Sequence, residues 1–296
     1  MTASPFSART RLFQGAAFVL ASEALLAVMA AIIKHLALEL PNEMLVFFRN
    51  LFGLVVVTPI ALRHGPRALV TRRLHLHLLR AIAGVGAMYC YFYTISSIPL
   101  AQAVLFKLTA PFFIPLIALA WLGERLPPTT LVAIAVGFVG VALILQPGLT
   151  GIPPAAVIGL IGAALAGGAK VAIRAMGATE PAPRIVFYFG SLATLVSATP
   201  LIWAWQTPTL AALAWLALMG VSATSAQLLL TRAYSIAPAG RIGPFSYVAV
   251  VYSSLLGWLV WGEIPKLLTV AGSLLITAAG ILTLYQPQPD QGARVS

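Results

Sequence analysis

Long apolar segments follow one another along the whole chain, and they constrain its fold more than any other feature. A helix needs about 20 predominantly apolar residues to cross the hydrocarbon core of a bilayer. Ten segments approach that length, each bounded by proline, glycine or charge: 12–37, 42–62, 75–96, 99–121, 128–146, 155–176, 184–205, 209–235, 239–261 and 267–286. The sequence therefore predicts an all-α polytopic membrane protein with ten transmembrane helices.

Charge is scarce and unevenly placed. Only 8% of the residues are charged, against about 25% in a typical soluble domain. The formal net charge of +11 comes from basic residues that gather in short connections. That placement indicates membrane topology, because a nucleic-acid interface needs its cations on one face. We therefore expect a lipid bilayer as partner and no nucleic acid.

The basic residues also predict an orientation, since cytoplasmic loops are enriched in lysine and arginine. With the N-terminus inside, few basic residues fall outside: Lys266, and Lys34 near a helix end, while the first outer turn carries Glu39 and Glu43. The arginines on the inner side are Arg9, Arg11, Arg63, Arg67, Arg72, Arg73, Arg125, Arg174, Arg184, Arg232, Arg241 and Arg294. The pattern predicts a multi-pass protein of a bacterial inner membrane with both termini cytoplasmic.

Two short motifs recur at a constant spacing. Residues 121–124 (WLGE) match residues 260–263 (VWGE), and 96–99 (SSIP) match 235–238 (SIAP), both at an offset of 139. A repeated offset of this kind indicates internal duplication. We therefore predict two repeats of five helices each, spanning 1–148 and 149–296, within one integral membrane domain.

An odd number of helices in each repeat has a topological consequence. The second copy must start on the opposite side of the membrane, so the repeats are inverted. Inverted repeats are a recurring design of secondary transporters, whose substrate site lies at the midplane between the two copies. The sequence thus favours a carrier that works by alternating access around a central cavity.

The same motifs resemble the drug/metabolite transporter superfamily, in its EamA-type branch. The resemblance covers nearly the whole chain and rests on Ile98-Pro99 through Gly123-Glu124, on Ala237-Pro238 through Gly262-Glu263, and on Phe48-Arg49. It implies a ten-helix basket whose fourth and ninth helices gate the cavity. The length and the aromatic third span are most similar to bacterial aromatic-amino-acid exporters. The second copy departs from the first, because Phe189 stands where a mate of Arg49 would be.

Ionisable residues in mid-membrane need a partner or a water-filled cavity. Glu23 in the first span and Lys107 in the fourth are the main candidates for substrate binding. They would bind the ammonium and the carboxylate of a zwitterion; the alternative is a permanent ion pair that only fixes helix packing. Arg49 is interpreted as structural, and Lys170 and Arg174 as snorkelling toward the cytoplasmic surface.

Further substrate-binding candidates are aromatic or polar. Tyr89, Phe92 and Tyr93 share one helical face by their spacing, which is typical either of an aromatic wall or of an interfacial belt. The repeat mates of Met88 and Lys107 are polar, and they extend the candidate set by Gln227, Ser246 and the adjacent Tyr247.

Helix-breaking residues recur in the fourth and ninth spans. Proline removes one backbone hydrogen bond and kinks a helix, so these positions are predicted hinges for gating, although packing alone also explains them. The predicted gating residues are Pro99, Pro111, Pro115, Pro238, Gly240, Gly243 and Pro244.

Other function classes lack a chemical basis in this sequence. It has no phosphate-binding loop, nucleophile elbow or metal-ligand set, so we expect no catalytic residue, no metal and no cofactor. The single cysteine, Cys90, lies in an apolar span, and His64, His75 and His77 are interpreted as solvated. We expect a small-molecule substrate, with an aromatic or large apolar amino acid as the leading class. Another small metabolite, a drug-like cation and a channel remain alternatives, and an intramembrane enzyme would have only Glu23 as acid or base. Substrate identity, direction, ion coupling and oligomeric state stay open.

Overall fold

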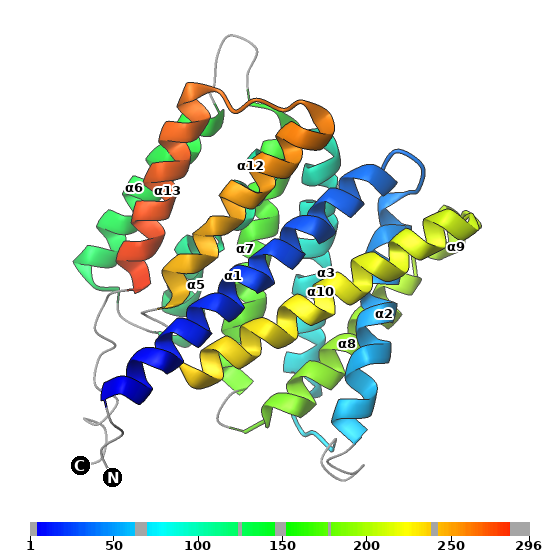
Figure 1. The fold of residues 1–296 in the computed structure, drawn as a ribbon. Coiled ribbons are helices and arrows are strands. Elements are labelled where there is room, and N and C mark those ends of the chain that lie inside the picture. Colours follow the sequence, from blue (N-terminus) through cyan, green and yellow to red (C-terminus); the bar gives the residue numbers. More distant parts are fainter. Residues whose placement is uncertain are drawn as a thin grey trace.

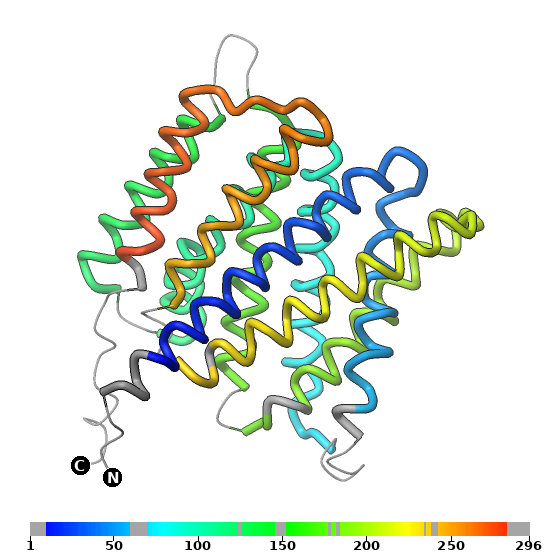
Figure 2. Tube along the Cα trace, in the orientation of Figure 1, coloured from blue at the N-terminus to red at the C-terminus, as the bar shows by residue number. Residues whose placement is uncertain are grey.

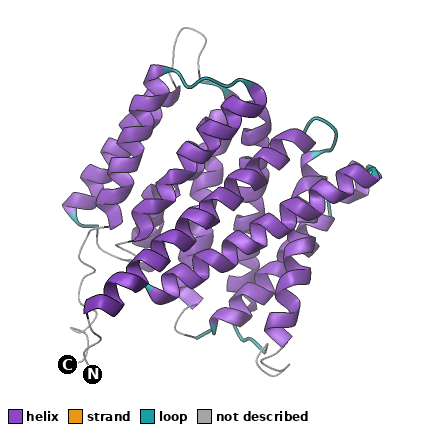
Figure 3. Cartoon of the chain, in the orientation of Figure 1, coloured by secondary structure: helices purple, strands orange, loops and turns teal. Residues whose placement is uncertain are grey.

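The computed structural model describes residues 5–62, 70–123, 126–145, 152–176, 179–237 and 242–284. Within these ranges every regular element is helical (Figure 3), which confirms the all-α prediction. The elements are α1 (Pro5–Leu36), α2 (Asn42–Leu62), α3 (Leu74–Ser97), α4 (Leu100–Lys107), α5 (Ala110–Leu122), α6 (Pro128–Leu145), α7 (Pro154–Met176), α8 (Ala182–Ala198), α9 (Leu201–Ala204), α10 (Leu210–Ile236), η2 (Gly243–Tyr247), α12 (Val248–Trp261) and α13 (Leu267–Leu284).

Seven helical stretches of the described chain are long and apolar enough to cross a membrane. They are Thr10–Leu36, Leu74–Ser97, Leu100–Leu122, Pro128–Leu145, Pro154–Met176, Leu210–Ala233 and Gly243–Trp261. Arg184–Ala198 and Leu267–Leu282 are apolar but shorter. The chain is a transmembrane protein, because large apolar side chains such as Ile202 and Leu267 are more than 80% exposed and need lipid to cover them.

The fourth predicted span, 99–121, is broken in the structure. α4 ends at Lys107 and α5 begins at Ala110, and the Thr109 hydroxyl donates to the Phe106 carbonyl over 2.6 Å at the break. Pro111 is the cause, because it has no N–H for the carbonyl of Lys107 four residues earlier. Lys107 is thus held at a helix end inside the bundle.

Prolines also divide two other predicted spans. Pro200 separates α8 from the short α9 inside the predicted segment 184–205. In the predicted segment 239–261, a 3₁₀ turn that contains Pro244 precedes α12. Both predicted gating segments thus depart from a continuous α-helix, the fourth at 108–109 and the ninth at Gly243–Tyr247.

Glycine in the left-handed conformation ends both α5 and α12. Gly123 has φ +68° and Gly262 has φ +66°, a conformation in which a side chain costs about 1–2 kcal/mol. These are the two glycines of the repeated Gly-Glu motif. The motif therefore matches in backbone conformation as well as in sequence.

The long helices pack in pairs drawn from different halves of the chain. α1 runs along α10, α3 along α7, α2 along α8 and α6 along α13 (Figures 1 and 2). Small residues permit the closest crossing: a Cβ at Gly140 of α6 would lie 2.7 Å from the Gly272 carbonyl of α13. Close backbone approach through glycine is typical of helix packing in lipid.

The bundle has two ends with different polar contacts. The connection from α12 to α13 and the turn from α1 to α2 lie at the upper end in Figure 1. The start of α3 and the start of α8 lie at the lower end in the same view. One apolar core joins α1, α2, α3 and α10, and a second joins α4, α5, α6 and α13.

Candidate functional site

Glu23 is a buried carboxylate within α1, with 6% of its surface exposed. The neighbouring Ser22 hydroxyl donates to the Ala226 carbonyl of α10 over 2.8 Å, which fixes this part of α1 against α10. The Ser246 side chain of η2 interacts with the Glu23 carboxylate. Glu23 therefore points into the bundle, where α1 meets the irregular start of the ninth segment.

Lys107 faces the same region from the end of α4. Its Nζ lies 5.3 Å from the centroid of the Tyr91 ring, a cation–π distance. The ammonium interacts electrostatically with Glu23 and with Arg49. Structure and sequence thus agree that Glu23 and Lys107 share one interior region.

Glu23 and Lys107 do not form a direct ion pair. Within the described residues, the contacts between acidic and basic side chains closer than 4.0 Å are Lys34–Glu263, His77–Glu180 and Arg184–Glu180. The two interior charges are therefore near enough to attract each other and too far apart to neutralise each other by contact.

Two further basic residues, Lys170 and Arg49, interact electrostatically with this region. Lys170 of α7 interacts electrostatically with Lys107 and Glu23, and its side chain is exposed, so the predicted snorkelling toward the cytoplasmic surface stays a prediction. Its position only two turns before the end of α7 gave that interpretation. Arg49 donates to the Asn50 side chain over 3.2 Å and interacts electrostatically with Lys107. No periodicity signals either contact, because both depend on how helices from different halves pack.

The three aromatic candidates of α3 do not gather around Lys107. Phe92 is 3% exposed and belongs to the apolar core, whereas Tyr93 is 41% exposed on the other side. Tyr89 packs against the same core as Phe92, and its carbonyl accepts a hydrogen bond from Asn42 over 3.0 Å. The ring beside Lys107 belongs to Tyr91, which the predicted face did not include.

The polar candidates of the second half also separate. Ser246 lies beside Glu23, and Tyr247 packs against α13, where a side chain at Gly280 would collide with its hydroxyl. Gln227 is exposed on α10. Of these three, the structure places Ser246 with the interior charges.

The predicted hinge residues lie at helix starts or breaks where the structure describes them. Pro99 precedes α4, Pro111 is in the first turn of α5, and Pro115 is inside α5. Gly243 and Pro244 form the first turn of η2. The remaining two candidates, Pro238 and Gly240, are outside the described residues.

A second polar cluster lies at the end of the bundle that carries the α12–α13 connection. Lys34 near the end of α1 forms an ion pair with Glu263 and donates to the Ile98 carbonyl over 3.0 Å. The other oxygen of Glu263 accepts from the Leu100 amide over 2.7 Å. Lys34 Nζ also lies 5.4 Å from the centroid of the Trp261 ring. We call Lys34, Glu263 and the 98–100 backbone the upper latch.

A small cavity of about 70 Å³ borders the latch and has Glu263 in its wall. It is lined by Pro99, Ala101, Gln102, Ser254, Glu263, Ile264, Pro265, Lys266 and Thr269.

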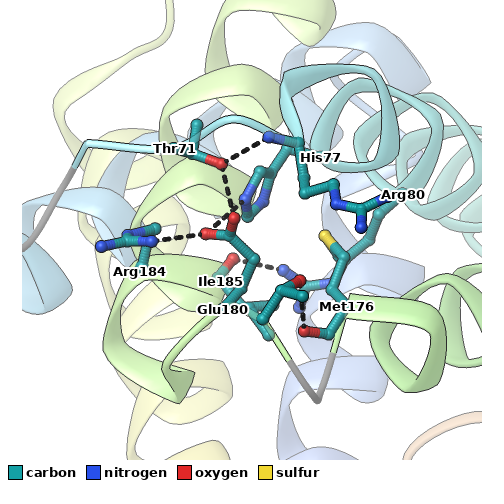
Figure 4. A network of polar contacts seen from close by, with 9 residues as sticks. Thr71, His77, Arg80, Met176, Glu180, Arg184 and Ile185 are labelled. Carbon is teal, nitrogen blue, oxygen red and sulfur yellow. Dashed lines mark hydrogen bonds and ion pairs between the residues drawn. The ribbon is translucent and has the colours of Figure 1, made fainter.

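A third cluster joins the lower end of α3 to the start of α8 (Figure 4). Glu180 accepts from the Thr71 hydroxyl over 2.8 Å and from Arg184 over 2.9 Å. Arg80 donates to the Ile185 carbonyl over 2.5 Å. A cavity of about 400 Å³ borders this cluster, lined by Val70, Arg72, Arg73, Thr179, Glu180 and Arg184. The cluster ties the two halves of the chain together at this end.

His77 corrects one sequence interpretation. We expected it to be solvated, but it is 1% exposed and stacks on Tyr188 of α8 with ring centroids 4.6 Å apart. Its Nε2 lies 3.5 Å from Glu180, and neither ring nitrogen has a hydrogen-bond partner of good geometry. His77 lies in the first turn of α3, on the side that packs against Tyr188 of α8. His64 is outside the described residues.

The pKa of Glu180 reflects these contacts. Burial raises it, but hydrogen bonds from Arg184 and Thr71 favour the ionised form, and the resulting pKa lies below the ordinary value. Glu180 is therefore an anion that holds the lower cluster together. In the described part of the chain no three His, Cys, Asp or Glu side chains are grouped so as to hold a metal ion.

Comparison with known proteins finds one matching family model and relatives that are named as exporters or transporters. The model of the EamA-like transporter family matches residues 13–146 and again residues 153–285. A pseudopaline exporter of Pseudomonas aeruginosa is 37% identical over 257 residues, which cover 86% of this chain and 90% of that protein. A riboflavin transporter of Brucella anthropi is 28% identical, covering 86% and 90%. An S-adenosylmethionine uptake transporter of Rickettsia bellii is 26% identical, covering 88% and 90%.

The fold also resembles that of solved structures. A crystal structure of another protein matches 93% of this chain and 97% of its own chain, with a TM-score of 0.61 at 20% identity. At that identity the likeness concerns the fold alone.

Proposed function

Because the chain belongs to the EamA-like transporter family, we propose that it is a secondary transporter that exports amino acids across the bacterial inner membrane by alternating access. The observation that carries this proposal is the separation of Glu23 and Lys107. A zwitterion placed between them would give its ammonium to the carboxylate and its carboxylate to the lysine. Ser246 supplies a polar neighbour on the Glu23 side.

The predicted preference for aromatic or large apolar side chains now rests on Tyr91. Its ring contacts Lys107, so a substrate carboxylate bound to the lysine would bring its side chain close to an aromatic surface. The predicted contribution of Tyr89, Phe92 and Tyr93 is weaker support, since Phe92 is packed in the core and Tyr93 is exposed elsewhere.

We propose that ten helices form two inverted repeats, 1–148 and 149–296, with both termini cytoplasmic. Three observations support this arrangement. The same family model matches once in each half. Gly123 and Gly262 end corresponding helices in the same left-handed conformation. The packing of α1 on α10 has a counterpart in that of α7 on α3, which a two-fold axis would exchange.

Alternating access would use the upper latch as one of two gates. In the structure Lys34 and Glu263 tie α1, the start of α4 and the α12–α13 connection together. The breaks between α4 and α5 and at η2 provide places where the two gating segments can bend. A substrate at Glu23 would be released to the upper side when the latch opens.

Outward transport is supported by the relative named as a pseudopaline exporter. The relatives named for riboflavin and for S-adenosylmethionine uptake favour a second candidate, a carrier for a different small metabolite. A carrier and a channel differ in one observable. Only in a carrier does substrate on the opposite side of the membrane increase the rate of uptake of the labelled substrate.

Counterflow in proteoliposomes tests this proposal. Vesicles with purified protein are loaded in turn with unlabelled amino acids, and uptake of the labelled amino acid is followed. We expect stimulation by the internal amino acid, strongest for aromatic or large apolar ones. Conductance without counterflow would instead show a channel, and folded protein that exchanges no amino acid would reject the amino-acid assignment.

A further inference from the structure

The cavity at the lower end of the bundle has a wall with more basic than acidic side chains. Its volume is about 400 Å³, which is in the range of about 300–1,000 Å³ that is typical of small-molecule pockets. The charged residues of the wall are three arginines and one glutamate: Arg72, Arg73, Arg184 and Glu180. The cavity is therefore large enough for a ligand, and its wall has a net positive charge.

The one carboxylate in this wall is already engaged by the protein. One oxygen of Glu180 accepts from the Thr71 hydroxyl over 2.8 Å, and the other accepts from Arg184 over 2.9 Å (Figure 4). The Nε2 atom of His77 lies 3.5 Å from that second oxygen. Glu180 and Arg184 thus balance each other's charge, and the uncompensated positive charge of the wall comes from the remaining two arginines.

Those two arginines, Arg72 and Arg73, have exposed side chains. Among the residues that the structure describes, neither guanidinium group has a hydrogen bond or an ion pair. The backbone that carries them is nevertheless fixed, because the Arg73 amide donates to the Thr71 hydroxyl over 2.9 Å. Two guanidinium groups are thus available to a ligand at the edge of the cavity.

The apolar surface beside the cavity indicates its depth in the membrane. Leu74, Leu78 and Ile82 of α3 are exposed, and their spacing places them in one stripe along the helix. Exposed apolar side chains in such a stripe need lipid to cover them. The stripe begins directly after Arg73, so the arginines lie where the lipid-facing surface of α3 ends. Basic pockets at the ends of transmembrane helices are suited to the headgroups of anionic lipids.

We propose that this cavity binds a phosphate group with a net negative charge, presented either by the headgroup of an anionic phospholipid or by a free phosphate anion. Arg72 and Arg73 would donate charge-assisted hydrogen bonds to the phosphate oxygens, which guanidinium groups can form in pairs. A zwitterionic headgroup fits less well, because its ammonium group brings positive charge to a wall that is already positive. The exposed stripe of α3 favours the lipid, whose acyl chains would lie along Leu74 and Leu78.

A phosphate group bound here would add to the contacts between the two halves of the chain. The segment 70–73 precedes α3 in the half matched by the first copy of the family model, and the segment 179–184 belongs to the half matched by the second. A ligand that binds the folded protein raises its melting temperature. The site can therefore be tested without transport, and its failure would leave the proposed function untouched.

Thermal melting of the purified protein in detergent tests the inference. Dioctanoyl phosphatidylglycerol, dioctanoyl phosphatidylcholine and inorganic phosphate are titrated at constant ionic strength, and the apparent Kd is obtained from the rise in melting temperature. We expect a saturating rise with phosphatidylglycerol and little or none with phosphatidylcholine.

A double variant and its matched control locate the site. An arginine near an anionic lipid contributes a factor of about five in affinity, so the double variant Arg72→Gln, Arg73→Gln should bind about 25-fold more weakly. Because both side chains are exposed, this variant should melt at the parent temperature without ligand. The double variant Arg11→Gln, Arg232→Gln also loses two exposed arginines, which lie outside the cavity wall, and it should keep the parent affinity.

The three ligands separate the outcomes. Saturable stabilisation by phosphatidylglycerol alone assigns the site to a lipid headgroup, and equal stabilisation by inorganic phosphate assigns it to a free phosphate anion. If neither raises the melting temperature, or if phosphatidylcholine acts as strongly as phosphatidylglycerol, the inference is wrong. An affinity that is unchanged without Arg72 and Arg73, or that falls equally in the control, would also overturn it.

Discussion

Lys34 and Glu263, which are 229 residues apart in the chain, form an ion pair that joins the end of α1 to the turn after α12. Each partner has a further backbone contact in the turn between α3 and α4, since Lys34 donates to the Ile98 carbonyl and Glu263 accepts from the Leu100 amide. Three segments thus meet at two side chains. This arrangement joins the three segments at the upper end of the bundle.

Breaking the latch is expected to open that end. In Glu263→Gln and in Lys34→Met the ion pair is lost, so a cysteine introduced at Gln102 in the adjacent cavity should react with a membrane-impermeant maleimide several times faster from the outer side. Cys90 is first replaced by alanine so that the introduced thiol is the only one. An unchanged labelling rate in both variants would show that the ion pair does not control access.

Glu180 is expected to make stability depend on pH. Its pKa in the folded protein is below the ordinary value because hydrogen bonds from Arg184 and Thr71 outweigh the effect of burial. Its stabilising contribution is therefore complete above its unfolded pKa of about 4.3, and it is lost as the pH falls through the lower folded pKa. Melting temperature, followed by intrinsic fluorescence from pH 7 to pH 3, should fall in that acidic range.

The variant Glu180→Gln isolates this effect. It should lose about 2 kcal/mol of stability at pH 7, the usual order for hydrogen bonds to a charged group, and its melting temperature should vary less with pH below 5. A variant with the same acidic dependence as the parent would assign the effect to another carboxylate.

The left-handed glycine after α12 is expected to be sensitive to any side chain. Gly262→Ala should destabilise the protein by about 1–2 kcal/mol, since a Cβ there meets no neighbour and the cost is confined to the backbone. Gly168→Ala is the matched control, because Gly168 is inside α7 and also has open space around it. That change should be neutral or slightly stabilising, and equal melting temperatures for the two variants would contradict the backbone explanation.

The break before α5 is expected to matter for turnover. Pro111→Ala restores an amide that can reach the Lys107 carbonyl, so α4 and α5 can join into a stiffer helix. We expect severalfold slower exchange with an unchanged melting temperature. Pro128→Ala in the first turn of α6, where proline removes no helical hydrogen bond, should exchange at the parent rate. Equal rates for both variants would remove the hinge role from Pro111.

The sequence predicted where the helices begin and end better than it predicted which face of each helix points into the bundle. Apolar length and bounding prolines located most helix ends, and the Gly-Glu motif located the ends of α5 and α12. Rotation of each helix was not predictable, because lipid and protein interior are equally apolar and leave little amphipathic signal. That is why the face with Tyr89, Phe92 and Tyr93 was preferred over Tyr91.

The candidate site was predictable only where the depth of a residue in the membrane was enough to identify it. Glu23 and Lys107 were identified by the cost of charge in mid-membrane, which depends on depth alone. Lys170 was interpreted as snorkelling from its depth in α7, and its side chain is exposed; its depth did not indicate the electrostatic interaction with Lys107 and Glu23. His77 was misjudged because its contact with Tyr188 joins two different halves of the chain.

The central claim is that Glu23 and Lys107 bind the transported molecule from opposite sides, and counterflow by a Lys107→Ala variant tests it most directly. The variant is reconstituted beside the parent and beside Arg232→Ala, and exchange of the best amino acid from the panel is compared after melting shows that all three are folded. We predict that Lys107→Ala loses exchange while Arg232→Ala retains it. Exchange by Lys107→Ala with unchanged kinetics would contradict the account and move the substrate away from this pair of charges.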